Sequence, residues 1–217
     1  MARPVLESEM KQIGDSVVQM GELIELSISG AIKSFREKDS NAARAIIADG
    51  ERIDDMEDEI NTSCFEFLAT QQPLAGDLRH MISIMKVVRD LERIGDHCED
   101  IAKYTMRFEN ETLFKEVIDI PRMADISSRM VKNAIDAFVH RDLRLARRVW
   151  KADEDVDEIF RDLFDELIDI ADKEPQHAKQ CIMLLFIAAH LERIADYATN
   201  ICEETVFVIE GTMNMEV

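Results

Sequence analysis

The sequence predicts an all-α protein built from long helices. Only 7 of its 217 residues are Gly and 4 are Pro, whereas an all-β chain of this length would need many more turn residues. Apolar residues make up 47% and recur at spacings of three and four, the period of a helix face that packs on a core. An internal repeat of about 100 residues also divides the chain into two similar halves. We therefore expect six long helices in two tandem three-helix bundles, residues 1–110 and 111–217.

The first half contains three helical patterns. Apolar residues follow one helix face from Met10 to Phe35, and Asp39 is a suitable N-cap for the next helix because its carboxylate can accept hydrogen bonds from first-turn N–H groups. That second helix should end before Pro73, since proline disfavours helix in the residue that precedes it. The apolar residues that follow one face of the third helix are Leu78, Ile82, Met85, Val88, Leu91, Ile94, Ile101 and Tyr104.

The second half repeats these features in the same order. The segment around Phe35 and Asp39 recurs around Phe138 and Asp142 at a shift of 103 residues. The sequence Leu-Glu-Arg-Ile-x-Asp of the third helix recurs at a shift of 100 residues. Two copies of a three-helix unit thus follow one another, with the break between residues 107 and 121. Short connections within each copy predict an up-down-up bundle.

The charge balance excludes several kinds of partner. The chain has 26 basic and 45 acidic residues, a net charge of −19. Nucleic acids and anionic membranes attract Lys and Arg, so neither is expected to bind directly, and membrane contact should occur only through partner proteins. Cations and basic protein surfaces are the expected counterparts.

No segment is apolar enough to suggest secretion or membrane insertion. The first residues lack the apolar stretch of a signal peptide, and the longest uncharged apolar run, residues 181–189, is shorter than the roughly 20 residues of a membrane span. The four cysteines show no C-x-x-C spacing and lie among apolar residues. We therefore expect a cytoplasmic protein with reduced core cysteines.

Two carboxylates stand four residues apart in each third helix, Glu92 with Asp96 and Glu192 with Asp196. Residues at this spacing share a helix face, with Cβ atoms about 5–6 Å apart. Because 45 residues are acidic, a merely solvated acidic face is one interpretation. Recurrence at the same place in both units favours the other interpretation, a cation site.

The second helix of each unit offers partners for these pairs. In the second unit they are Asp153 and Asp157, and the aligned residues of the first unit are Gly50 and Asp54. The first unit therefore lacks one carboxylate and should bind metal more weakly. Acidic residues near Gly50 that could substitute are Asp49, Glu51, Glu57 and Asp58. Such all-oxygen sites suit Mg, Mn, Fe or Zn ions, and bridging carboxylates can hold more than one. The predicted metal ligands are Asp54, Glu92, Asp96, Asp153, Asp157, Glu192 and Asp196.

Other chemistry-bearing patterns are weak. Arg93 and Arg193 repeat, and could either orient the ligating carboxylates or neutralise acids within their own helices. The five histidines show no metal-binding spacing on the helices. There is neither a glycine-rich phosphate loop nor a serine nucleophile motif, so we expect no enzymatic activity.

Several of these motifs resemble the PhoU family. The resemblance rests on Gln-Pro-Leu-Ala-Gly-Asp-Leu-Arg at 72–79, on Val-Arg-Asp-Leu-Glu-Arg-Ile-Gly-Asp at 88–96, and on Leu-Glu-Arg-Ile-Ala-Asp at 191–196. It spans residues 5–212 in the family's order. It implies two three-helix bundles and metal binding by E/D-x-x-x-D motifs, which here fall on the seven predicted ligands. Gly50 departs from that pattern and puts the site of the first unit in question.

The resemblance also implies a function. PhoU proteins are regulatory adaptors that link a phosphate ABC transporter, through its ATPase subunit, to a membrane histidine kinase, and they repress the phosphate regulon when phosphate is plentiful. A homodimer is expected as well, because an acidic helical surface with apolar stripes can self-associate. Two alternatives stay open from the residues alone. One is a metal-dependent enzyme or metal-buffering protein, and the other is a structural helical scaffold.

Overall fold

The computed structural model describes residues 3–109, 112–114, 118–213 and 215. Those residues form six long helices and one short 3₁₀ turn, with no strand in the described ranges, which confirms the predicted all-α class. The junction proposed between residues 110 and 111 lies outside the described residues. The helices are α1 (Arg3–Glu37), α2 (Ser40–Gln71), α3 (Ala75–Met106), α4 (Asp119–His140), α5 (Leu143–Lys173) and α6 (Ala178–Glu210), and the 3₁₀ turn is η1 (Pro175–His177).

The second helix of each unit begins at the predicted aspartate. Asp39 accepts hydrogen bonds of 2.9 and 3.1 Å from the backbone N–H groups two and three residues later. Asp142 makes the same two bonds, at 2.9 and 3.0 Å, at the start of α5. These caps satisfy N–H groups that the helix itself leaves without acceptors. The internal repeat therefore extends to the local chemistry that starts each helix.

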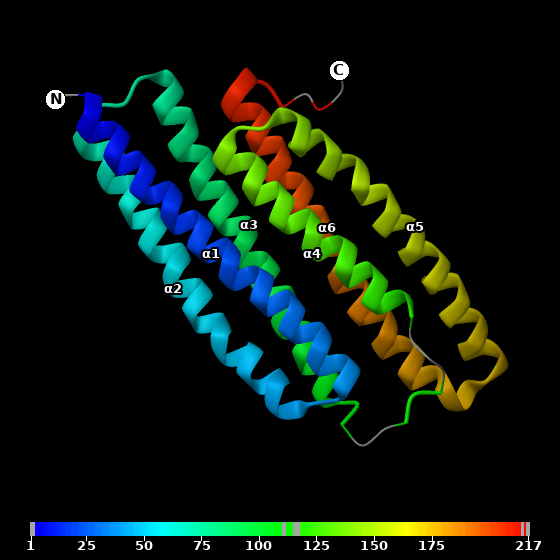
Figure 1. Cartoon of the computed structure of the whole chain (residues 1–217). Coiled ribbons are helices and arrows are strands. Elements are labelled where there is room, and N and C mark those ends of the chain that lie inside the picture. The colour runs from blue at the N-terminus through cyan, green and yellow to red at the C-terminus, as the bar shows by residue number, and fades with distance from the viewer. Residues whose placement is uncertain (1–2, 110–111, 115–117, 214, 216–217) are drawn as a thin grey trace.

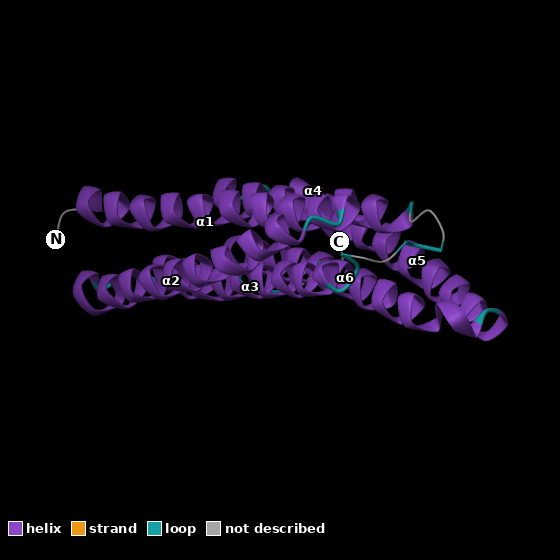
Figure 2. Cartoon of the chain, turned by 90° about the horizontal axis from the view of Figure 1, so that it is seen from below, coloured by secondary structure: helices purple, strands orange, loops and turns teal. Residues whose placement is uncertain are grey.

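The six helices form two layers (Figures 1 and 2). One layer holds α1 and α4, which touch each other, and the other holds α2, α3, α6 and α5 in that order. Within the first unit α1 packs on α2 and α3, and within the second α4 packs on α5 and α6. The two three-helix bundles meet mainly where α3 packs against α6. We call this contact the α3–α6 seam.

The two helices of the seam run antiparallel. Ser83, near the start of α3, donates a 2.7 Å hydrogen bond to Glu204, near the end of α6. Tyr104, near the end of α3, stacks on Phe186, near the start of α6, with ring centroids 5.2 Å apart. The seam therefore follows most of the length of both helices and joins the units into one packed body (Figure 1).

The burial of aligned residues agrees with the repeat, but the buried face of the third helix differs from the predicted one. Phe35 and Phe138 are buried, with exposures of 3% and 2%. The face predicted for the third helix is partly wrong, because Leu78 and Ile82 are about two-fifths exposed while Met81 is buried. Helix α3 packs against α1 and α2 on one side and against α6 on the other. A single apolar face, with residues spaced three and four apart, therefore does not describe its buried surface.

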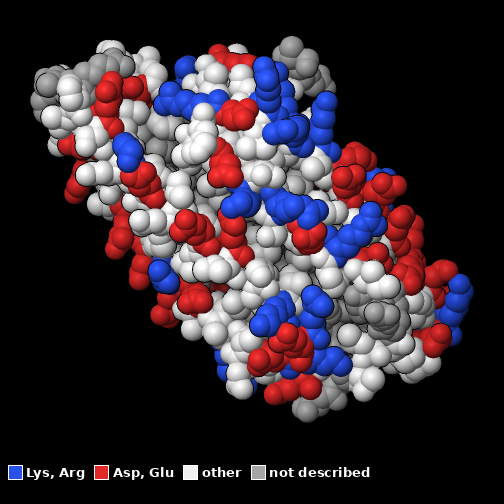
Figure 3. Space-filling model, in the orientation of Figure 1, with Lys and Arg blue, Asp and Glu red and all other residues white. Residues whose placement is uncertain are grey.

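The remaining surface is charged and offers no membrane span. On the face formed by α1 and α4, acidic side chains gather toward the outer edges, while Lys and Arg are interspersed across the centre (Figure 3). None of the described helices is long and apolar enough to cross a bilayer. The four cysteines are buried free thiols, as expected for core residues.

Candidate metal sites of the two units

Close packing sets the distance between the helices that carry the acidic motifs. Gly95 of α3 faces Ile53 of α2 so closely that an added Cβ would lie 2.9 Å from the Ile53 Cδ1 atom. The aligned residues of the second unit are Ala195 and Val156, both fully buried. Compared with the first unit, the second unit has one methyl group fewer on its second helix and one more on its third helix. Both units thus have a small residue on the third helix where it packs closely on the second.

The second unit brings its four predicted carboxylates together. Asp153 and Asp157 lie on α5, and Glu192 and Asp196 lie on α6, with Asp153 about half-buried. Burial, together with the charges of Asp157 and Asp196, raises the pKa of Asp153 to about 6. Burial and neighbouring carboxylates also raise the pKa of Glu192 and of Asp196. A concentration of negative charge in a partly desolvated place is what a bound cation would relieve.

The first unit brings its own carboxylates to the matching level. Burial, followed by the charges of Asp96, Glu57 and Asp54, raises the pKa of Glu92. Arg93 pairs with both acids of its own motif, because its Nε lies 3.4 Å from Glu92 and its Nη1 lies 3.0 Å from Asp96. The two ion pairs neutralise charge within the helix of Arg93 and also restrict the Glu92 and Asp96 side chains.

Gly50 makes room for a carboxylate from the opposite helix. A Cβ atom added at Gly50 would overlap the Oε1 atom of Glu99, which extends from α3 onto α2 at this point. Glu99 also pairs with Lys103 at 3.2 Å. A carboxylate of the third helix thus lies beside the position where the second unit has Asp153 on its second helix. Glu99 was not among the substitutes expected from the sequence, which were Asp49, Glu51, Glu57 and Asp58.

One signal in the sequence could have found Glu99. Glu99 lies seven residues after Glu92, so it shares a helix face with that residue. Its aligned residue in the second unit is Thr199, and a search for acids that repeat in both units therefore passes over it. Glu57 was considered only as a substitute for Gly50, but its charge acts on Glu92.

Within each acidic cluster, the carboxylates face the same region but do not lie close enough together to hold one ion as they stand. Within the described ranges, only His97, Asp100 and His190 place three ligand atoms within 4.8 Å of one another. Like charges repel, and neighbouring carboxylates add to burial in raising the pKa of Glu92 and of Glu192. The donor set fits hard or borderline cations, which would draw the side chains together.

The fold and the internal repeat are those of one family. The family model described as PhoU domain matches this chain twice, at residues 17–105 and 120–205. The chain belongs to the PhoU family. A relative from Clostridium acetobutylicum, named "Phosphate-specific transport system accessory protein PhoU homolog", is 37% identical over 212 residues, which cover 97% of each chain.

Solved PhoU structures share the whole architecture. The crystal structure of PhoU from Pseudomonas aeruginosa superposes with a TM-score of 0.92 at 30% identity, covering 95% of this chain and 99% of that one. The crystal structure of "the phosphate transport system regulatory protein PhoU from Streptococcus pneumoniae" superposes with a TM-score of 0.90 at 30% identity, covering 96% and 99%. The two tandem units are therefore those of a PhoU protein over nearly the full chain.

Proposed function

We propose that this chain is a non-enzymatic regulatory adaptor of phosphate uptake that acts in the cytoplasm. The observation that supports this most strongly is the 37% identity, over 97% of both chains, to an accessory protein of a phosphate-specific transport system. In this proposal the chain contacts the ATPase subunit of a phosphate ABC transporter and a two-component histidine kinase. It represses the phosphate regulon when phosphate is plentiful.

Charge supports protein partners over other ligands. The net charge of −19 favours basic protein surfaces and disfavours anionic lipids and nucleic acids. Exposed apolar side chains, such as Phe65 on α2 and Phe164 on α5, interrupt the acidic surface. They supply apolar area that a partner or a second copy of the chain could bury, and a homodimer is part of the proposal.

Metal binding by the acidic clusters is the second part of the proposal. Asp153, Asp157, Glu192 and Asp196 would hold metal in the second unit. Asp54, Glu92 and Asp96, with Glu99 in the place left by Gly50, would do so in the first. The bound ions, of Fe, Zn, Mn or Mg, would supply positive charge that joins the second and third helices of each unit. Because metal binds the folded form, it should raise the melting temperature.

A pull-down with metal-site variants tests the proposal. The wild type, Glu192→Ala/Asp196→Ala and Glu92→Ala/Asp96→Ala are offered to the transporter ATPase subunit and to the cytoplasmic part of the kinase, with and without added metal. Wild type should capture both partners. Each double variant should stay folded, since Ala favours helix, and should lose metal from its own unit by elemental analysis.

Two outcomes would overturn parts of the proposal separately. Failure of the wild type to bind either partner rejects the adaptor role. Retention of wild-type metal content by both double variants would mean that the acidic faces are merely solvated. Turnover of phosphoesters that depends on metal would favour the alternative of a metal-dependent enzyme.

A further inference from the structure

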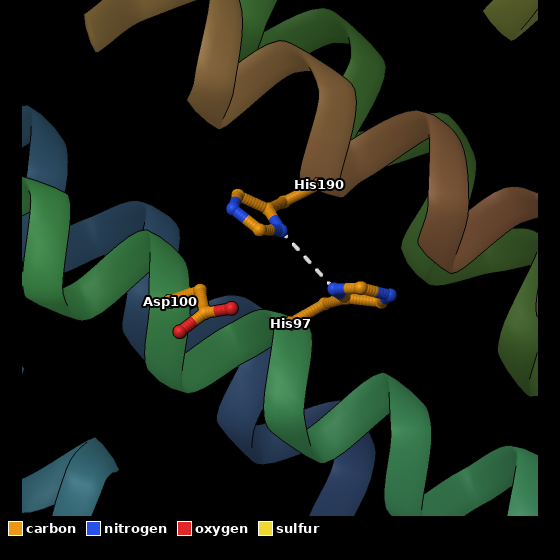
Figure 4. Close-up of side chains that lie close together, drawn as sticks. All are labelled: His97, Asp100 and His190. Carbon is orange, nitrogen blue, oxygen red and sulfur yellow. Dashed lines mark hydrogen bonds between the residues drawn. The ribbon is translucent and has the colours of Figure 1, made fainter.

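A cluster of different chemistry lies in the α3–α6 seam, next to the acidic motif of α3. His97 and Asp100 come from α3, and His190 comes from α6 (Figure 4). One ligand atom of each lies within 4.8 Å of the others. His97 follows Asp96 by one residue, which turns it about 100° around the helix, toward α6 instead of α2. The cluster therefore faces α6, although Asp96 of the first unit's acidic motif lines the same cavity.

We propose that His97, Asp100 and His190 form a binding site for one divalent transition-metal ion at the junction of the two units. The distance between the imidazoles carries the argument. The Nδ1 atoms of His97 and His190 are 3.1 Å apart. Two nitrogens bound to one zinc ion at about 2.0–2.1 Å, at angles between 90° and 109°, are about 2.8–3.4 Å apart. The observed separation lies within that interval.

The donor set selects the kind of ion. Imidazole nitrogens suit zinc and the later first-row transition metals, whereas magnesium and calcium prefer sites made only of oxygen. Asp100 adds one carboxylate to the two imidazoles, and one of its oxygens accepts a 3.0 Å hydrogen bond from Lys103. Its other oxygen is left to serve as a ligand. Three protein ligands leave room for water or a small anion in the coordination sphere.

The surroundings fit a partly enclosed ion. His97 and Asp100 line a cavity of about 520 Å³. Its other lining residues are Arg93, Asp96, Lys103, Arg193 and Tyr197. Arg93 and Lys103 pair with carboxylates of their own helix, which reduces their repulsion of a cation. The Nε2 atom of His97 is buried and makes no hydrogen bond to any described residue. The His97 ring also packs against Tyr197, with ring centroids 5.7 Å apart, while its Nδ1 atom faces His190.

The repeat predicts one such site per chain. By the 100-residue shift of the third helices, His97 aligns with Tyr197 and His190 aligns with Asp90. The related pair, Asp90 and Tyr197, therefore offers no second pair of imidazoles. Because His190 belongs to one unit and His97 to the other, an ion bound here would tie the two bundles together.

Cobalt(II) binding tests the proposal on the full-length protein after treatment with a chelator. A low-coordinate cobalt(II) ion with nitrogen ligands gives strong visible d–d bands, whereas cobalt(II) in an octahedral all-oxygen site gives weak ones. Wild type should gain these bands with one ion per chain, and Zn²⁺ should displace it. His97→Asn and His190→Asn should lose the bands and bind at least tenfold more weakly.

Matched variants keep the test decisive. His140→Asn, which changes an exposed histidine of α4, should leave the bands unchanged. Glu192→Ala/Asp196→Ala should also keep them, which separates this site from the acidic clusters of the proposed function. If His97→Asn does not fold by circular dichroism, His190→Asn and Asp100→Asn decide the result. Absence of the bands in wild type, or their persistence in the folded histidine variants, overturns the proposal and leaves the imidazole pair as a hydrogen bond between the units.

Discussion

The acidic cluster of the second unit takes two carboxylates from each of two helices, while that of the first unit draws unequally on its two. On α5, Asp153 stands where α2 has Gly50, and burial raises the pKa of Asp153 to about 6. On α2, the space above Gly50 is filled by the Glu99 side chain of α3. A carboxylate on a long flexible side chain thus takes the place of one on a short side chain.

This difference teaches that a repeat can keep a charge while changing the helix that supplies it. Alignment of the two units makes the first look one acid short, but the structure places Glu99 in the vacant space. The two clusters should therefore differ in the freedom of their ligands more than in their charge. Asp153 needs few torsions to be fixed, whereas Glu99 must order more of its side chain.

The largest expected effect concerns what the units share. Phe35→Ala and Phe138→Ala should each lower the free energy of unfolding by about 3–5 kcal/mol, because both rings are buried at aligned places in the core. Chemical denaturation of each variant measures this. A cost below about 1 kcal/mol at both positions would contradict the equivalence of the two cores.

A second prediction concerns the exchanged carboxylate. Gly50→Ala should displace Glu99 and weaken metal binding in the first unit about tenfold, on the scale of changes that disturb ligand placement. Titration of metal into a Glu192→Ala/Asp196→Ala background isolates this unit. Gly76→Ala is the matched control, since nothing lies within 4 Å of a Cβ added there.

The double variant Gly50→Asp/Glu99→Ala sharpens this prediction, because it gives the first unit the pattern of the second. Metal binding should recover relative to Gly50→Ala. If Gly50→Ala binds metal as tightly as the same background without it, Glu99 does not serve as a ligand.

A third prediction concerns pH in the metal-free protein. Since burial raises the folded-state pKa of Asp153 to about 6, the folded chain holds a proton that the unfolded chain releases between about pH 4 and 6. This residue therefore makes stability fall as pH rises through that window. Asp153→Asn should remove that loss and stabilise the chelated protein at pH 7 by about 1 kcal/mol, allowing for solvent at a half-buried site.

The control for this prediction is Asp155→Asn, which changes an exposed acid on the same helix. Melting temperatures of the chelated proteins between pH 4 and 7 give the comparison. Identical pH profiles for wild type and Asp153→Asn would contradict the strain assigned to this carboxylate.

The smallest expected effect concerns the contact between Gly95 and Ile53, which is Ala195 and Val156 in the second unit. Gly95→Ala should cost about 1 kcal/mol, because the new Cβ would lie 2.9 Å from the Cδ1 atom of Ile53, an end of a side chain that can shift. Ile53→Val in the same chain reproduces the residues of the second unit and should recover most of the loss. Additive costs in the double variant would show that the two residues do not compensate.

The sequence predicted what depends on local chemistry and periodicity. The aspartate caps, the helix end before Pro73 and the buried Phe35 and Phe138 each follow from a preference that acts within a few residues. The acidic motifs were found because they repeat. The chain's membership of the PhoU family followed from the same motifs.

What the sequence did not predict depends on contacts between distant residues. Leu78 is exposed because α6, about 100 residues later, helps to determine which face of α3 is buried. Glu99 was missed because a space left by a glycine cannot be seen along a single helix. His97 and His190 gave no signal because they are 93 residues apart and meet only across the seam.

The α3–α6 seam also determines the order in which the protein can be completed during synthesis. Ser83 and Val87 of α3 are fully buried in the finished protein. Their helix face stays uncovered until α6, the last of the described long helices, has left the ribosome. At about 5–20 residues per second, the roughly 100 intervening residues take about 5–20 s to make. During that time the nascent first unit exposes a helix face without its partner, so α3 is where premature association or chaperone binding should concentrate.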